Sequence, residues 1–356
     1  MPVLTAANPQ LLTLLREAKG WNQGELAAAS GLTQSFLSRA ERGFVELGGD
    51  RLVNVADALH CPVELLTHDD VSPISLSSTV FHRRRRSRIS VVAARRFEAI
   101  SHLTRITVDG LISATGREPT CLLAHTGGGD PAVMADRMRQ QWQIPDGPIA
   151  DVCALLDRAG IVVVVRRFDQ AAQDAMSLWP HGRTPSIVVR WGMSVDRLRF
   201  TLCHELAHLV MHAEPGPDVE READRFAAEF LLPAEQITPQ LRGLTTGDFD
   251  RLMDLKRQWR VSIAALIQRA MTLGLISERQ FREFRVKLSQ FGWNTVEPID
   301  LQPEQPHLLE SVINDLSTRP DLTEVDIAAA AGMTPEAFSR HYRHHTPPTD
   351  PEAVQR

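Results

Sequence analysis

The stretch RFTLCHELAHLVMH, residues 199–212, is the most informative part of the sequence. Apolar residues recur through it at helical spacing, which predicts an α-helix. His204 and His208 are four positions apart, so their side chains share one helix face and can reach the same metal ion. Glu205 is rotated one step from that face, which suits a general base better than a ligand. Because buried His and Glu are costly in an otherwise apolar helix, the pattern indicates a metal site.

A second helix is predicted for EREADRFAAEFLLP, residues 220–233, and it offers the remaining ligand. A catalytic zinc site has three protein ligands and one open position. Glu220 and Asp224 are four apart, so Glu220 is expected to bind zinc while Asp224 accepts a hydrogen bond from a ligand histidine. Glu222 is the alternative ligand, although no carboxylate follows it four residues later. We expect a structural contact, and not a fourth ligand, from His212.

Together these motifs resemble the ImmA/IrrE family of metallopeptidases, the M78 type, from about Ile89 to Trp293. The resemblance also includes a predicted strand at 187–190, the approach at 197–201, and the ending Leu231, Leu232 and Pro233. Ala207 departs from the glycine that is common in the family, and it leaves the ligands intact. The resemblance implies a thermolysin-like zinc core, with a small sheet and the active-site helix behind its edge strand. Further strands are predicted at 161–165 and 175–179, and a helix at 149–159; a substrate peptide could add to the sheet edge.

Residues 9–66 show the pattern of several short helices. Asn22 precedes Glu25 by three positions, which predicts a capping box at a helix start. Gly31 supplies a tight turn, and Thr33 can cap the next helix. A DNA-reading helix-turn-helix has this order: a helix, a turn that contains glycine, and a second helix with a polar face.

This segment resembles the lambda-repressor-like, XRE-type DNA-binding domain. The resemblance implies that Gln23 touches phosphate and that five residues face the major groove of double-stranded DNA: Thr33, Gln34, Ser35, Ser38 and Arg39. It also suggests a homodimer on a palindromic site. The alternative is a helical bundle that no longer binds DNA.

Charge is distributed unevenly around a formal total of −5. Residues 1–70 hold five basic and nine acidic residues, and residues 97–356 hold 27 and 35. Between them, residues 71–96 hold seven arginines and no acid, at positions 83–86, 88, 95 and 96. These arginines could contact DNA phosphates or form a solvated helix start.

Residues 327–340 repeat residues 26–39 with seven identities in fourteen positions. The repeat could be a second DNA-binding or dimerising unit, or an ordinary packing of short helices, which we favour. Thr334, Pro335 and Glu336 form a good helix start.

The length of 356 residues suggests two or three domains. We expect a mostly helical α+β chain: a lambda-repressor-like domain (1–70), a basic linker (71–88), a thermolysin-like zinc peptidase (89–295), a helical segment (296–343) and a tail (344–356). No apolar run approaches the roughly 20 residues of a membrane helix. The start lacks a signal-peptide pattern and the four cysteines are scattered, so a cytoplasmic protein with no membrane partner is expected.

Two functions follow from these predictions. The first is a DNA-binding transcriptional regulator with a gluzincin-like zinc endopeptidase that cleaves a repressor, either a partner or itself, in a stress or mobile-element response. The second is a transcription factor or antitoxin-like repressor whose peptidase-like domain is a sensor or dimerisation module without turnover.

Overall fold

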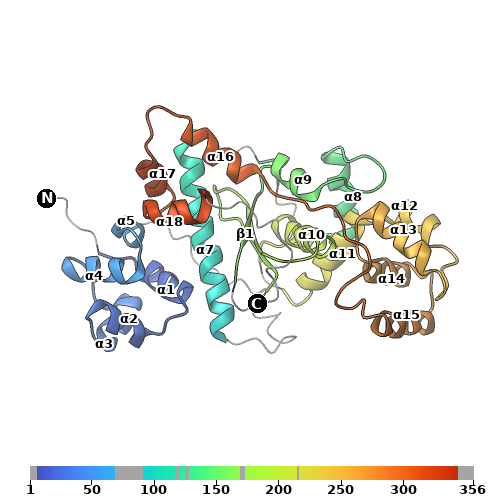
Figure 1. Cartoon of the computed structure of the whole chain (residues 1–356), viewed down its shortest axis with the longest axis horizontal. Helices are drawn as coiled ribbons and strands as arrows, with labels where there is room; N and C mark the ends of the chain where they lie inside the picture. Colours follow the sequence, from blue (N-terminus) through green and yellow to red (C-terminus); the bar gives the residue numbers. More distant parts are fainter. Residues whose placement is uncertain are drawn as a thin grey trace.

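The computed structural model describes residues 6–68, 91–117, 121–124, 128–168, 173–214 and 216–343. The arginines at 83–88 and the tail at 344–356 lie outside the described residues. The architecture is a mostly helical α+β fold around one small sheet, as the sequence predicts (Figure 1). None of the helices in these ranges combines the length and apolar character needed to cross a membrane.

Residues 6–68 form a bundle of short helices around an aliphatic core. The helices are α1 (Pro9–Ala18), α2 (Gln23–Ser30), α3 (Gln34–Glu41), α4 (Asp50–Leu59) and α5 (Val63–Leu66). The predicted capping box of Asn22 and Glu25 is present at the start of α2. Gly31 ends α2 with a φ of 67°, in the left-handed region that glycine enters without strain. Thr33 caps α3 by accepting a hydrogen bond from the Phe36 amide.

Three strands form the sheet in the order β1-β3-β2. They are β1 (Val162–Arg166), β2 (Ala175–Leu178) and β3 (Ser186–Arg190), close to the predicted strands. The central β3 pairs in parallel with β1 and antiparallel with β2. Strand β2 is therefore an edge strand, and its Ser177 lies opposite Ile187.

The long helix α7 (Val91–Ala114) runs between the N-terminal bundle and the sheet (Figure 1). On one side, Ala99 and Ile106 pack with Leu11 and Leu14 of α1. On the other side, Ala94 and Phe97 form an apolar cluster with Met176 and Leu178 of β2. One helix thus contacts both the bundle and the edge strand.

The largest apolar core lies on the other side of the sheet. It is built by the sheet and by α8 (Pro131–Gln141), α9 (Val152–Arg158), α10 (Val195–Met211), α11 (Val219–Leu231), α12 (Ala234–Leu241), α13 (Phe249–Trp259), α14 (Ile263–Thr272) and α15 (Glu278–Gln290). Helix α9 is shorter than the predicted helix at 149–159, because the Asp151 side chain caps it at the Ala154 amide.

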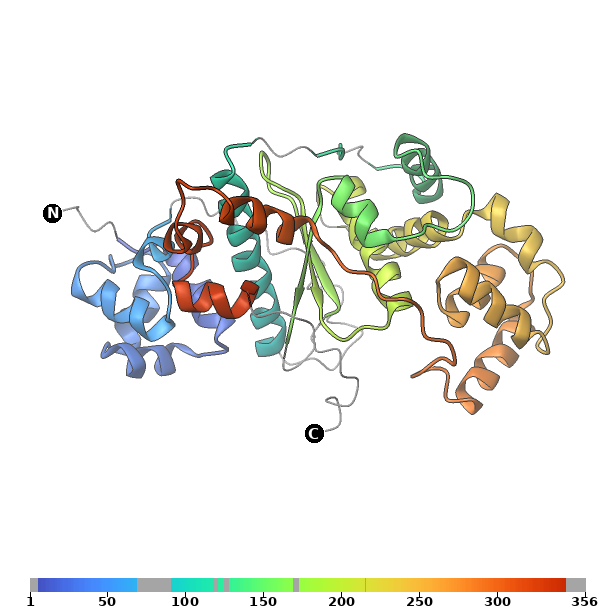
Figure 2. The same ribbon diagram turned by 45° about the horizontal axis from the view of Figure 1, so that its top comes forward.

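After α15 the chain crosses back over this region toward α7 (Figure 2). Glu304 fixes the crossing segment: its carboxylate accepts a hydrogen bond from the Val152 amide and pairs with Arg199 of α10. The last elements are α16 (Leu308–Ser317), α17 (Glu324–Ala330), α18 (Pro335–Phe338) and a π-helical turn, η1 (Ser339–Arg343). They bury an apolar cluster against α7 and β1.

Candidate metal centre

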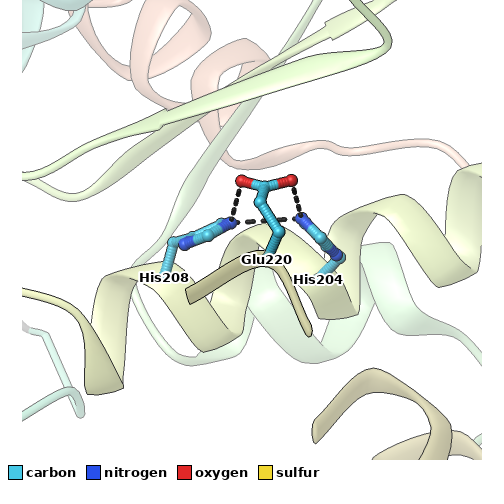
Figure 3. Close-up of side chains that lie close together, drawn as sticks. All are labelled: His204, His208 and Glu220. Atoms are coloured by element: carbon cyan, nitrogen blue, oxygen red, sulfur yellow. Dashed lines mark hydrogen bonds and ion pairs between the residues drawn. The ribbon is translucent and has the colours of Figure 1, made fainter. Parts of the chain in front are cut away.

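Helix α10 places His204 and His208 on one face, with their Nε2 atoms 3.1 Å apart (Figure 3). The helix is buried along most of its length, and the two histidines are only 6% and 7% exposed. Desolvated imidazoles need polar partners, which come from α11 and from His212 at the end of α10.

Glu220, at the start of α11, directs its carboxylate at both histidines (Figure 3). Its Oε1 lies 3.4 Å from Nε2 of His208, and its Oε2 lies 3.7 Å from Nε2 of His204. Ligand atoms around tetrahedral zinc, with bonds of about 2.0–2.2 Å, lie roughly 3.3–3.6 Å apart. The separations of 3.1–3.7 Å and the His, His, Glu donor set therefore fit a zinc ion.

The outer nitrogens of both histidines are held by further side chains. Nδ1 of His204 lies 2.9 Å from the Asp224 carboxylate, as the four-residue spacing from Glu220 predicts. Nδ1 of His208 lies 3.0 Å from Nδ1 of His212, whose Nε2 lies 3.1 Å from Glu222. Glu222, the alternative ligand in the sequence, thus contacts His212, while Glu220 faces the two Nε2 atoms. Burial and the neighbouring His208 lower the pKa of His212.

Glu205 lies beside the centre and beneath the edge strand. Its Oε2 accepts hydrogen bonds from the Ser177 amide at 2.9 Å and from the Ser177 hydroxyl at 2.8 Å. Glu205 is only 3% exposed. Sequence reasoning missed Ser177, although a lone polar residue between Met176 and Leu178 must face away from their apolar side. Because the Ser177 amide donates to Glu205, the outer edge of β2 faces α10.

Asp151, Cys153 and Glu304 form a second group of possible ligands within the described residues. The Glu304 carboxylate is already used by Val152 and Arg199. Burial raises the pKa of the Cys153 thiol, which disfavours the thiolate that binds metals. This group is better explained as a structural network.

The proposed DNA-contacting residues lie on the surface of the N-terminal bundle. Thr33, Gln34, Ser35 and Arg39 are exposed, and Ser38 and Gln23 are half-buried. Gln34 donates a hydrogen bond to Gln23, which donates to Glu41. A hydrogen bond therefore links Gln23, the predicted phosphate contact, to Gln34, a predicted base-reading residue.

Comparison with known proteins finds a family match for the N-terminal bundle and another for the region of the candidate metal centre. Residues 12–66 match the helix-turn-helix family model, and residues 156–271 match the IrrE N-terminal-like domain of the Peptidase_M78 family. The chain joins an XRE-type helix-turn-helix domain to an IrrE-like domain. The IrrE-like match includes β1–β3 and all the residues around the candidate metal centre.

One curated relative is similar over a short segment. An uncharacterized HTH-type transcriptional regulator, y4dL of Sinorhizobium fredii, is 50% identical over 56 residues. The aligned segment covers 16% of this chain and 29% of the relative. This chain thus spans less than a third of the length of the curated relative that it matches.

Proposed function

We propose that the chain is a DNA-binding transcriptional regulator whose IrrE-like domain is a zinc-dependent endopeptidase. Its substrate is a repressor or similar regulatory protein, a partner or this chain itself, in a stress or mobile-element response. The observation that carries the proposal is the convergence of His204, His208 and Glu220, with Glu205 directly after His204 on α10. This is the set of ligands and base that metal-assisted peptide hydrolysis requires.

Each residue has a defined role in this proposal. His204, His208 and Glu220 would hold zinc, which acts as a Lewis acid when bound. Asp224 and His212 fix the orientation of the two imidazole rings. Glu205 accepts a proton from the attacking water and returns it to the leaving amine. An extended substrate peptide would add to the outer edge of β2, where it would displace the Ser177 amide from Glu205.

The substitution Glu205→Gln tests the peptidase. It should leave zinc content unchanged, because Glu205 is not among the ligands, and abolish cleavage. Metal content is measured by atomic emission, and cleavage by mass spectrometry of the chain itself and of repressors encoded beside it. A Glu205→Gln protein with wild-type cleavage would refute the mechanism.

The helix-turn-helix domain would bind double-stranded DNA as a homodimer, in the cytoplasm. Gln23 would contact phosphate, and Thr33, Gln34, Ser35, Ser38 and Arg39 would face the major groove. Selection of duplexes from a random pool by the purified chain tests this part independently of proteolysis.

A second candidate function is a zinc-binding regulator without turnover, such as a sensor, a dimerisation module or an antitoxin-like repressor. The observation that favours it is the contact between Ser177 and Glu205, because both hydrogen bonds already engage the candidate base under β2. Stoichiometric zinc in a wild-type protein that cleaves neither itself nor co-expressed repressors would favour this function over the first.

A further inference from the structure

The helix-turn-helix domain carries little positive charge that could hold DNA. Its described residues, 6–68, include five basic and seven acidic side chains. Arg16 is buried against Glu41, and Lys19 donates to the Ala58 carbonyl. DNA affinity depends strongly on basic side chains that neutralise phosphates. The exposed basic residues of the domain are Arg39, Arg42 and Arg51, and positive charge from elsewhere in the chain would add to theirs.

Helix α7 brings an arginine to the edge of the DNA-reading surface. A groove of about 510 Å³ is lined by Arg16, Asn22, Gln23, Gly24 and Gln34 of the helix-turn-helix domain and by Arg95 of α7. Gln23 and Gln34 are two of the residues proposed to contact DNA. The Arg95 side chain is 60% exposed, and it lies 3.7 Å from the Glu17 carboxylate.

The contacts between α1 and α7 keep Arg95 in this position. The Arg96 side chain donates a hydrogen bond to the Ala18 carbonyl at 3.1 Å, at the C-terminal end of α1. Leu11 and Leu14 pack with Ala99 and Ile106 of α7. Glu17 also lies 3.6 Å from Arg16, so its charge is shared between two arginines. The Arg95 side chain is mostly exposed and 3.7 Å from Glu17, so this ion pair is weak and leaves Arg95 able to bind a phosphate.

We propose that duplex DNA held by the helix-turn-helix domain is also held by α7, through Arg95 and a backbone phosphate next to Gln23. The inference rests on the proposed DNA binding, and it makes the DNA interface a composite of two domains. A guanidinium group binds phosphate in bidentate geometry, and Gly24 presents no side chain that would obstruct the approach.

The test compares the full-length wild type with Arg95→Ala and with Arg117→Ala as the matched control. Arg117 lies just beyond the other end of α7, is 75% exposed and pairs with Asp315 at 3.4 Å, so both variants lose one exposed arginine. The probe is a 30-bp duplex selected by the wild type, with binding measured by fluorescence anisotropy over a series of KCl concentrations. Thermal melts establish that both variants fold.

Arg95→Ala should weaken binding several-fold and reduce the slope of log K against log [salt] by about 0.9, the contribution of one phosphate contact. Arg95→Ala should weaken binding to a scrambled duplex by the same factor, because phosphate contacts carry no sequence information. Arg117→Ala should leave both quantities unchanged, and Arg95→Lys should keep the wild-type slope.

Two outcomes separate this inference from the function on which it rests. If the wild type binds DNA and Arg95→Ala behaves like Arg117→Ala, the role of α7 is refuted while DNA binding stands. If the wild type selects no duplex, the proposed DNA binding fails, and the composite interface fails with it.

Discussion

At the scale of single residues, Asp224 is the clearest example of a side chain that acts through another. It lies 2.9 Å from Nδ1 of His204 and so directs Nε2 toward the candidate metal position. Replacing such a partner typically costs 10–100-fold in metal affinity. Asp224→Ala should therefore weaken zinc binding by about that factor, as measured by competition with a chromophoric chelator.

Asp218→Ala is the control for this measurement. Asp218 is an acid just before α11 that pairs with the exposed Arg221, so its loss changes the net charge equally. Equal zinc affinities for the two variants would contradict the role of Asp224.

His102, on α7, should make stability depend on pH. Burial and the nearby Arg105 lower the pKa of His102 to about 4, from an ordinary value of 6.5. The unfolded state therefore binds the proton more tightly, so this stability contribution is complete above pH 6.5 and is lost as the pH falls toward 4. Between pH 7.5 and 5.5 the loss should be about 1 kcal/mol. Urea unfolding at both pH values should show a smaller loss for His102→Gln, and an identical loss would contradict this assignment.

The sequence predicts much of the side-chain arrangement at the candidate metal centre because the key spacings are local. Four-residue intervals on two helices bring His204 to His208 and Glu220 to Asp224 on shared faces. The contact between Ser177 and Glu205 could not be predicted, since it joins a strand to a helix 28 residues away and depends on how β2 lies over α10. The contact between His212 and Glu222 likewise depends on the packing of α11 against α10.

At the scale of elements, α17 and α18 repeat the local structure of α2 and α3. Thr323 forms a capping box with Asp326, as Asn22 does with Glu25, 301 positions earlier. Gly332 has a φ of 66°, close to the 67° of Gly31. The repeat nevertheless packs on α7, and Glu336 occupies the position of Ser35. An acid at that position disfavours DNA, so packing is the better explanation of this segment.

The crossing of α17 over α7 requires a glycine. A Cβ at Gly110 would lie 1.9 Å from the Ala330 carbonyl oxygen. Thr107 donates a hydrogen bond to the Ala331 carbonyl at 2.9 Å, so the two helices are held close together. Gly110→Ala should lower the free energy of unfolding by about 1–3 kcal/mol, although alanine favours helices, because overpacking costs more than the propensity gains. Gly48→Ala, where a Cβ meets nothing within 4 Å, is the control in chemical denaturation. A stabilised Gly110→Ala protein would refute the close crossing.

The strands are local predictions, whereas their order is not. Alternating and continuous apolar runs locate β1, β2 and β3 to within a residue or two. The placement of β3 between β1 and β2 depends on which edges α7 and α10 cover, and no local pattern encodes that.

At the scale of the whole molecule, Glu304 ties the C-terminal segment to α10, the helix that carries His204 and His208 of the candidate metal centre. It pairs with Arg199, five residues before His204, and both side chains are fully buried. Removing one partner of a buried pair leaves an uncompensated charge and costs about 3–5 kcal/mol. Glu304→Ala should therefore destabilise the chain by that amount in urea unfolding. Glu310→Ala, which removes an exposed acid nearby, should change stability by less than about 0.5 kcal/mol. Equal effects of the two substitutions would show that the crossing segment is not anchored at Glu304.

The position of α7 has a thermodynamic consequence. The helix packs on α1 through one face and on β2 through another, so a displacement of either neighbour changes the contacts that α7 makes. Linkage is reciprocal: if a peptide seated along β2 alters duplex affinity by some factor, the duplex must alter peptide affinity by that same factor. Titrating each ligand in the presence of the other measures a single coupling free energy from two directions.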